Sequence, residues 1–151
     1  MDFTKLRGGE DLEVGALRAY RFWRYRFEPM VRLYSFVSEK HWPSGEAVEG
    51  GPIGPDVGEQ GIHAFKTKRM LLNAVGKRFD GLIKRAGFTH PPSHGIVVGS
   101  VEMWGILWEH ALGYRAQYAR PLSFISAHGY KPHEALARLR SDFGVAKKDH
   151  Y

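Results

Sequence analysis

The stretch VEMWGILWEHALGYRAQYARPL, residues 101–122, decides the fold that the sequence predicts. Apolar and aromatic residues recur on both sides of the short segment Ala111-Leu112-Gly113, which is typical of two antiparallel strands joined by a tight reversal. We therefore expect one strand over 96–110 and a second over 114–126, paired with each other.

The residues at this reversal predict a structural clasp. Glu109 and Arg115 are nearly symmetric about the turn and carry opposite charges, so a half-buried ion pair is expected, with Tyr114 beside it. Strand alternation sends His110 to the opposite face, toward solvent or a partner. The same alternation predicts a row of core residues on the first strand: Trp104, Ile106 and Trp108.

Upstream of this hairpin, the sequence predicts two more strands. Residues 17–27 are dense in aromatics, with mostly apolar odd positions, and Val31–Val37 alternates in the same way. Pro29 belongs in their connection, because proline cannot donate to a strand ladder. Residues 43–61, with six glycines and three prolines, predict a long mobile loop.

Two helices are predicted. Apolar residues recur at helical spacing over 67–86, with Thr67 as N-cap and Gly87 just after the end. A short C-terminal helix opens at Pro132 and ends at Gly144. The order of elements predicts a single α+β domain over residues 16–145. Its sheet is mainly antiparallel, its long helix packs on that sheet, and its termini, 1–15 and 146–151, are loose.

Composition restricts the function classes. The chain has 151 residues, a formal net charge of +6 and no cysteine. A basic balance favours anionic partners, nucleic acid first and an acidic protein surface second. No apolar run of membrane-spanning length occurs, so no membrane contact and a cytoplasmic location are expected.

The segment RAYRFWRYRF, residues 18–27, is the first candidate site. Four arginines alternate with five aromatics, which on an open sheet face combines phosphate contacts with surfaces on which bases stack. The competing interpretation is a structural strand whose arginines cover apolar area. The candidate contacts in this segment are Arg18, Arg21, Arg24 and Arg26 for phosphates, and Tyr20, Phe22 and Tyr25 for stacking.

A second group of cations comes at the start of the long helix. Lys66, Lys68 and Arg69 lie where the helix dipole is already positive, a misfit that can mark an anion site. Solvated surface charge is the alternative, and we add the three residues to the candidate nucleic-acid contacts.

A metal site is not expected. The chain has eight histidines, but no cysteine to complete a structural zinc site. His90 and His94 have a suitable spacing, yet Pro91-Pro92 prevent the helix that would align them. No cofactor is predicted either.

Three segments resemble a widespread family of small bacterial and phage proteins of unassigned function. These are Gly61-Ile-His-Ala-Phe-Lys66, VVGSVEMWGILWEHALGYRAQYARPL and LARLRSDFGV, with Trp42-Pro-Ser-Gly45 matching the family's opening. The resemblance covers about residues 16–145, and its specific part is E-H…G-Y-R-A. Members commonly carry cysteines before G-I-Y-A, where this chain has none, and His63 stands where tyrosine is usual. This puts any metal or redox role of the family in doubt here.

A looser similarity to small ADP-ribosyltransferases gives an alternative. It implies an enzyme that uses a nicotinamide dinucleotide, with His63 at the tyrosine position, Glu109 holding the ribose, and Arg18 or Arg21 at the pyrophosphate. Arg115 completes that candidate catalytic set. No nucleophile or metal set stands out from the residues themselves, so the leading hypothesis is a non-enzymatic binding module for an anionic partner. The oligomeric state is left open.

Overall fold

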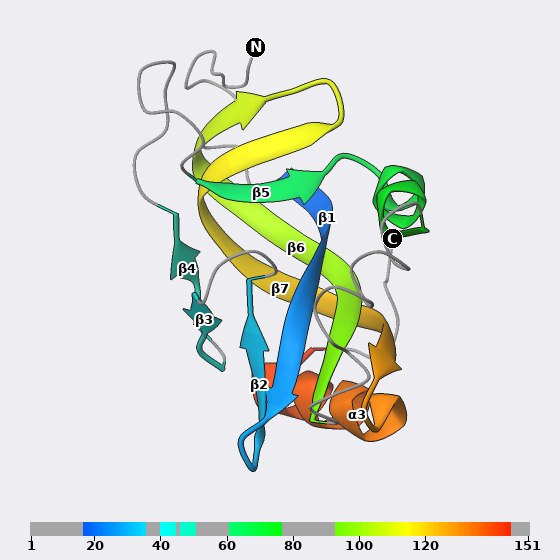
Figure 1. Ribbon diagram of the computed structural model, residues 1–151. Coiled ribbons are helices and arrows are strands. Elements are labelled where there is room, and N and C mark those ends of the chain that lie inside the picture. Colours follow the sequence, from blue (N-terminus) through cyan, green and yellow to red (C-terminus); the bar gives the residue numbers. More distant parts are fainter. Residues whose placement is uncertain (1–16, 36–39, 45, 51–60, 77–92, 146–151) are drawn as a thin grey trace.

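The computed structural model describes residues 17–35, 40–44, 46–50, 61–76 and 93–145 (Figure 1). The two termini predicted to be loose lie outside these residues. The described part is an α+β fold whose strand pairs are all antiparallel, so the predicted fold class is confirmed at this level. The seven strands are β1 (Leu17–Phe27), β2 (Val31–Tyr34), β3 (His41–Trp42), β4 (Val48–Glu49), β5 (Ile62–Phe65), β6 (His94–Glu109) and β7 (Gly113–Gly129).

The hairpin predicted from residues 101–122 is confirmed as β6 and β7. The two strands stay paired from Gly95↔Gly129 to Glu109↔Tyr114, interrupted by three register shifts. The last shift lies between Trp104 and Leu107, where Gly105 has φ 84° and the N–H of Ile106 donates to Gln117 Oε1 at 3.2 Å. One extra residue on β6 therefore forms a β-bulge.

The sheet closes on itself, which the sequence did not predict. β6 pairs with β1 on one edge and with β7 on the other. β5 pairs with β7 over its whole length and touches β1 through Tyr20↔Phe65. The path β1–β6–β7–β5–β1 returns to its start, and Figure 1 shows β5 crossing the upper part of this arrangement. We call it the strand ring.

The prediction that Trp104, Ile106 and Trp108 form a row of core residues on β6 is wrong, because the neighbouring odd-numbered positions face the core instead. Trp104 and Trp108 are only partly buried, and Ile106 is 43% exposed. The pairing of β1 with β6 sets the faces, because it places Ala19, an interior residue, opposite Val101. The buried residues of this part of β6 are Val101, Met103 and Leu107.

The interior is built on aromatic contacts. Trp23 packs edge-on against Trp42 with ring centroids 5.5 Å apart and against Phe124 at 5.4 Å. All three side chains are fully buried, and each such burial stabilises the fold by roughly 2–3 kcal/mol. Phe143 of α3 reaches the same cluster, with its ring 5.4 Å from that of Phe124.

The C-terminal helix α3 (Pro132–Phe143) lies across the lower end of the molecule, near β2 and β7, and confirms that prediction (Figure 1). Pro132 occupies its first turn, and Gly144 ends it in the left-handed conformation at φ 65°. Ala135 and Leu139 turn their side chains into the core. This helix therefore closes the end of the ring opposite the β6–β7 turn.

The predicted helix over 67–86 is seen only in its first part. Residues 68–76 are helical, and Thr67 Oγ1 accepts a hydrogen bond from the Met70 N–H at 3.1 Å, so the predicted N-cap is confirmed. Leu71 is fully buried. Residues 77–92, including Gly87, lie outside the described part. The described residues thus show helix in two places, 68–76 and α3, rather than the single long helix over 67–86 together with a short one that the sequence predicts.

The segment 43–61 is not a loop throughout. Val48 is buried and pairs with Ala119 in the short strand β4, on the edge of β7. A strand of two residues has no alternation that a sequence pattern could reveal, which is why it was missed. Residues 51–60 lie outside the described part.

Candidate functional site

β1 separates its residues as the alternation predicted, and this puts two of the candidate contacts, Arg21 and Tyr25, on the odd-numbered side that also carries core residues. Ala19 and Trp23 face the core. Tyr25 is also fully buried, and its hydroxyl donates to the Tyr130 carbonyl oxygen at 2.7 Å. The prediction that Tyr25 stacks on bases is therefore wrong, because its ring has no exposed face. Arg21 also shares this odd-numbered side. The partly buried residues of the even side are Arg18, Tyr20, Phe22, Arg24 and Arg26.

The β1–β2 hairpin extends this even side onto two more strands. Arg26 lies opposite Arg32, Arg24 lies opposite Tyr34, and Tyr34 lies opposite His41 of β3. We define the hairpin face as Arg24, Arg26, Glu28, Arg32, Tyr34 and His41. Sequence reasoning missed Arg32, Tyr34 and His41. The alternation of Arg32 and Tyr34 with the buried Val31 and Leu33 was the available signal.

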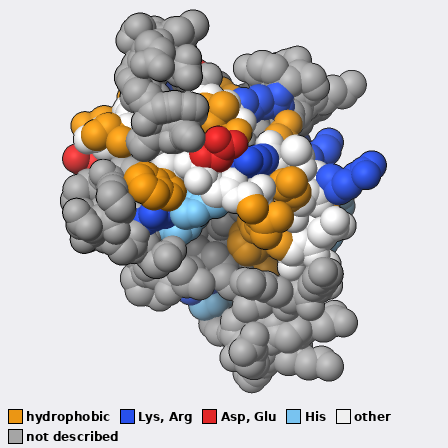
Figure 2. Space-filling model, turned by 90° about the horizontal axis from the view of Figure 1, so that it is seen from above, with side chains coloured by type: hydrophobic (Ala, Val, Ile, Leu, Met, Phe, Trp, Pro, Cys, Tyr) orange, Lys and Arg blue, Asp and Glu red, His pale blue; other side chains and the backbone are white. Residues whose placement is uncertain are grey.

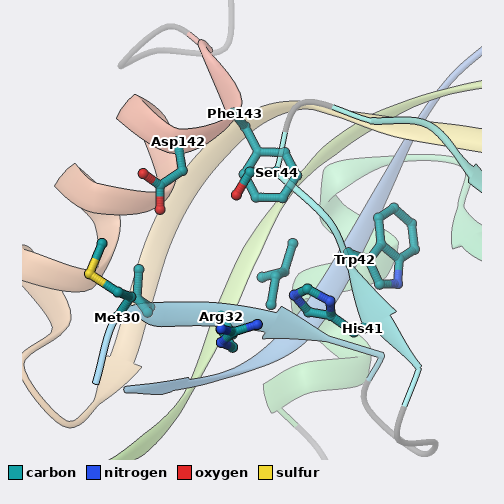
Figure 3. Close-up of a pocket in the computed structure, with 9 residues that line it drawn as sticks. Met30, Arg32, His41, Trp42, Ser44, Asp142 and Phe143 are labelled. Carbon is teal, nitrogen blue, oxygen red and sulfur yellow. The ribbon is translucent and has the colours of Figure 1, made fainter. Parts of the chain in front are cut away.

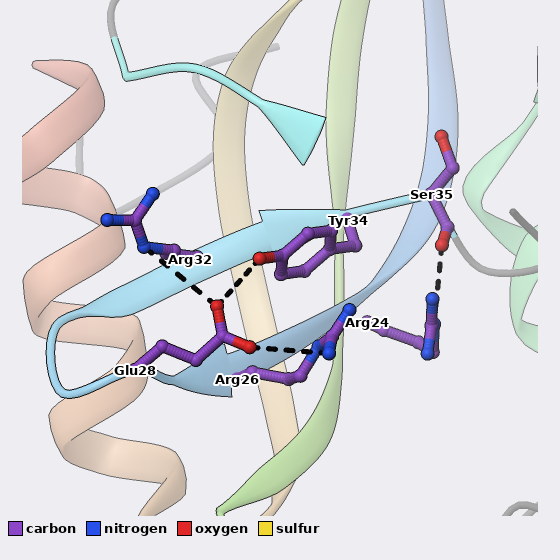
Figure 4. Close-up of polar contacts among 6 residues, drawn as sticks. All are labelled: Arg24, Arg26, Glu28, Arg32, Tyr34 and Ser35. Atoms are coloured by element: carbon purple, nitrogen blue, oxygen red, sulfur yellow. Dashed lines mark hydrogen bonds and ion pairs between the residues drawn. The ribbon is translucent and has the colours of Figure 1, made fainter. Parts of the chain in front are cut away.

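A single carboxylate organises the hairpin face (Figure 4). Glu28 accepts a hydrogen bond from the Tyr34 hydroxyl at 2.7 Å and lies 3.3 Å from Arg26 Nη1 and 3.9 Å from Arg32 Nε. The Arg26 guanidinium stacks over the Tyr34 ring, 4.1 Å from its centroid. Burial and the bond to Glu28 raise the pKa of Tyr34. Arg24 Nε donates to the Ser35 carbonyl oxygen at 3.3 Å. Two guanidinium groups, those of Arg26 and Arg32, thus share one carboxylate.

At the other end of β1, the structure joins the two candidate segments of the sequence. Tyr20 pairs with Phe65, and the Phe22 and Phe65 rings meet edge-on at 6.4 Å. Lys68 and Arg69 follow directly at the exposed start of the 68–76 helix. The 18–22 and 65–69 segments are therefore neighbours, although more than forty positions separate them in the chain.

The middle of the even side is not an open surface. Ile96 and Val98 lie opposite Arg24 and Phe22 and are almost completely buried. Arg18 stacks over Tyr20, 5.3 Å from the ring centroid, and two of its guanidinium nitrogens are buried. Contacts of β1 with a large partner are therefore expected at the two ends of the strand, where Arg32 and Arg69 are the exposed arginines.

Arg21 lies apart from both ends. Its Nη1 donates to the His63 carbonyl oxygen and its Nη2 to Ser35 Oγ at 3.0 Å, and the guanidinium stacks 4.9 Å from the Trp42 ring. Trp42 Nε1 donates to the same Ser35 oxygen at 3.0 Å. Burial lowers the pKa of Arg21 to about 10. Among the described residues no carboxylate lies within ion-pair distance of it. Arg21 thus ties β1 to β3, β5 and the end of β2.

The predicted clasp at the β6–β7 turn has different members. Glu109 Oε2 pairs with Lys66 Nζ at 2.7 Å, and this bond raises the pKa of Lys66. Arg115, only 5% exposed, donates from Nε to His110 Nε2 at 2.9 Å. The expected Glu109–Arg115 pair is therefore replaced by two contacts, Glu109 with Lys66 and Arg115 with His110. His110 was expected to face solvent or a partner; it is exposed, but it also accepts this hydrogen bond from Arg115. The reason is β5, whose end brings Lys66 beside Glu109.

This end of the molecule also holds the alternative catalytic set. His63 lies opposite Arg115, and Glu109 lies opposite Tyr114 in the strand ladders. Seen from above, acidic, basic, histidine and hydrophobic side chains crowd together on this end (Figure 2). Glu109 and Arg115 are both engaged, by Lys66 and by His110. The geometry therefore gives the dinucleotide-enzyme alternative no specific support.

A cavity of about 240 Å³ opens beside the hairpin face, between β2, β3 and the end of α3 (Figure 3). Its apolar lining comes from Met30, Val31, Leu33, Trp42 and Phe143, and its polar lining from Arg32, His41, Ser44 and Asp142. Arg32 and His41 belong to the hairpin face, so the cavity and that face are continuous.

Comparisons with protein-family models, curated proteins and solved structures found no match to the chain. Within the described residues no cluster of three or more His, Asp or Glu side chains could hold a metal ion. No helix in the described part of the chain is long and apolar enough to span a membrane.

Proposed function

We propose that the protein is a small, basic, non-enzymatic binding module for an anionic partner, with nucleic acid as the first candidate. The observation that supports this most is the Arg26↔Arg32 pairing, which sets two guanidinium groups directly opposite each other on the hairpin face. Arg24 adds a third on the same side of the sheet.

Like charges directly opposite each other across two strands destabilise a sheet. Glu28 offsets this only in part, because its one carboxylate is shared between Arg26 and Arg32 and lies 3.9 Å from Arg32 Nε. A phosphate placed between Arg26 and Arg32 would remove the repulsion. The planar fork of arginine matches two phosphate oxygens at once, which a lysine cannot do.

The aromatic members of the face give the partner a second type of contact. Tyr34 and His41 have their ring centroids 5.4 Å apart, and His41 is exposed. Aromatic rings beside a track of cations are the usual means by which proteins hold single-stranded nucleic acid without strict sequence choice. An acidic protein surface has the charge but not the bases, so it is the second candidate.

Fluorescence anisotropy with short single-stranded and double-stranded DNA and RNA, from low to physiological salt, tests the proposal. Affinity should fall steeply with salt, because bound phosphates release counterions. The double variant Arg26→Ala/Arg32→Ala should bind weakly and with a shallower salt slope. Arg120→Ala/Arg138→Ala is the matched control, since both arginines are about half exposed and lie on other elements in ion pairs.

Two results would count against the proposal. If no nucleic acid binds even at low salt, the nucleic-acid version is wrong and an acidic protein partner is left. If the control variant loses as much affinity as the hairpin-face variant, net charge alone attracts the ligand and the hairpin face is not the site.

A further inference from the structure

The cavity beside the hairpin face is lined by groups of opposite charge, Arg32 and Asp142, and the proposed function uses only the arginine. Figure 3 shows Arg32 and His41, from the strands, on one side and Asp142 and Phe143, from α3, on the other. Ser44 completes the polar lining. Positive charge therefore faces negative charge across a space whose remaining lining is apolar.

The size of the cavity restricts its ligand. A volume of about 240 Å³ is below the range typical of sites for drug-sized molecules, which begin near 300 Å³. It suits one small ring system. Met30, which is 54% exposed, and the partly buried Phe143 offer apolar surface to such a ring. Val31, Leu33 and Trp42 also line the cavity but are almost fully buried. A free inorganic anion would leave this surface unused.

The charges restrict the ligand further. Arg32 is 48% exposed and lies directly opposite Arg26, so a phosphate on the hairpin face reaches the rim of the cavity. The Asp142 carboxylate can only accept hydrogen bonds, and it would repel a phosphate. It suits a group that donates, such as the exocyclic amino group of a base.

We infer that this cavity takes one unstacked nucleobase that carries an exocyclic amino group, with its phosphate on Arg32 and its amino group on Asp142. The inference rests on the proposed function, because the base must arrive on a strand held by the hairpin face. Single strands are the expected ligand, since bases are recognised in this way once they are free of a duplex.

Three fluorescein-labelled thymidine octamers test this inference. They differ only at one central position, which is thymine, cytosine or an abasic site. The cytosine octamer should bind about tenfold more tightly than the thymine octamer, because thymine presents carbonyl oxygens to the Asp142 carboxylate. The abasic octamer should bind most weakly, and a duplex of the cytosine octamer should lose the preference.

The variant Asp142→Ala removes the acceptor and should therefore remove the preference for cytosine while leaving the salt slope unchanged. Asp142 is exposed, so the variant is expected to fold. Glu134→Ala is the matched control, since it removes one carboxylate from the same helix, at a residue that does not line the cavity. It should keep the cytosine preference.

The outcomes separate the inference from the proposed function. If the three octamers bind equally and with a steep salt dependence, the strand is held by its phosphates and the cavity inference is wrong, while the proposed function stands. If Asp142→Ala keeps the preference, the assignment of the amino group to Asp142 is wrong. If no octamer binds at low salt, the proposed function fails and the inference fails with it.

Discussion

Lys66 Nζ lies 2.7 Å from Glu109 Oε2, and this ion pair joins the residue after β5 to the last residue of β6. The Lys66 N–H also donates to the Leu112 carbonyl oxygen at 3.0 Å, so backbone and side chain of one residue hold both sides of the β6–β7 turn. The pair is partly exposed, with 25% and 39% of the two side chains open to solvent. It therefore marks where the strand ring closes but contributes little to its stability.

The first prediction follows from the different burial of the two contacts at this turn. Arg115→Ala should lower the free energy of unfolding by about 1–3 kcal/mol, because Arg115 is buried and its removal deletes packed side-chain volume together with the hydrogen bond to His110. Glu109→Gln should change stability much less, since its ion pair is partly exposed. Denaturant melts of both variants check this. Equal losses would mean that Glu109 and Arg115 act as one unit, as the sequence had suggested.

The sequence could predict the long elements of the fold but not how they close. β1, β6, β7 and α3 each have enough residues for alternation or helical spacing to be read, and their bounds agree with the predicted ranges within a few positions. β3, β4 and β5 have two to four residues, too few for any period. The position of each short strand depends on which strand edges stay unpaired after the long strands have paired. That is a property of the tertiary structure, and no local sequence pattern records it.

The same limit applies to the candidate site. Alternation along β1 separated three of the four arginines, Arg18, Arg24 and Arg26, from the core side, but it could not show that Ile96 and Val98 are buried on the side of these arginines. Nor could it show that Arg26 meets Arg32, which depends on a turn of three residues, Glu28 to Met30. The neighbouring position of the 18–22 and 65–69 segments depends on the single pair Tyr20↔Phe65.

The second prediction concerns alkaline pH. Burial raises the pKa of Tyr25 to about 12 from its ordinary value of 10.0. Between pH 10 and about pH 12, the Tyr25 phenol therefore keeps its proton in the folded state but has lost it in the unfolded state. This contribution to stability is present below pH 10 and is lost as the pH rises from 10 toward 12. Arg21 has the opposite effect, because its pKa is lower in the folded state than in the unfolded state. Above about pH 10 the folded state therefore binds fewer protons at Arg21 than the unfolded state does, and this residue's contribution to stability rises with pH.

The variant Tyr25→Phe isolates the first effect from the second. At pH 9 it should be less stable than wild type by about 1 kcal/mol, since the bond to the Tyr130 carbonyl oxygen is lost. At pH 11 the difference should shrink, because wild type has begun to lose the contribution of the phenol. Urea melts of both proteins at the two pH values measure it. A difference that grows with pH would contradict the raised pKa.

The third prediction tests whether the Arg21 charge stabilises the fold. A partly buried cation without a carboxylate partner among the described residues costs desolvation energy, which two hydrogen bonds and the Trp42 ring offset in part. Arg21→Met should therefore fold with a stability within about 1 kcal/mol of wild type, since methionine keeps much of the volume. Arg21→Ala should lose about 2–4 kcal/mol, because it leaves a cavity beside Trp42. A loss of that size in the methionine variant would show that the hydrogen bonds to Ser35 and His63 dominate.

The last prediction tests the closure of the strand ring through a glycine. Gly113 begins β7 opposite Phe65, and a Cβ atom there would lie 2.0 Å from the Ala64 carbonyl oxygen. That oxygen belongs to the backbone of β5, so no side-chain rotation can relieve the clash. Gly113→Ala should therefore push β5 away from β7 and lower the free energy of unfolding by about 3 kcal/mol.

Gly76→Ala is the matched control, because nothing lies within 4 Å of its added Cβ and residue 76 is helical. Alanine there should be neutral or stabilising by about 0.5–1 kcal/mol. Denaturant melts, with hydrogen exchange of the β5 amides as a second measurement, distinguish the two variants. If Gly113→Ala keeps both wild-type stability and the protection of the Ile62–Phe65 amides, β5 does not close the ring.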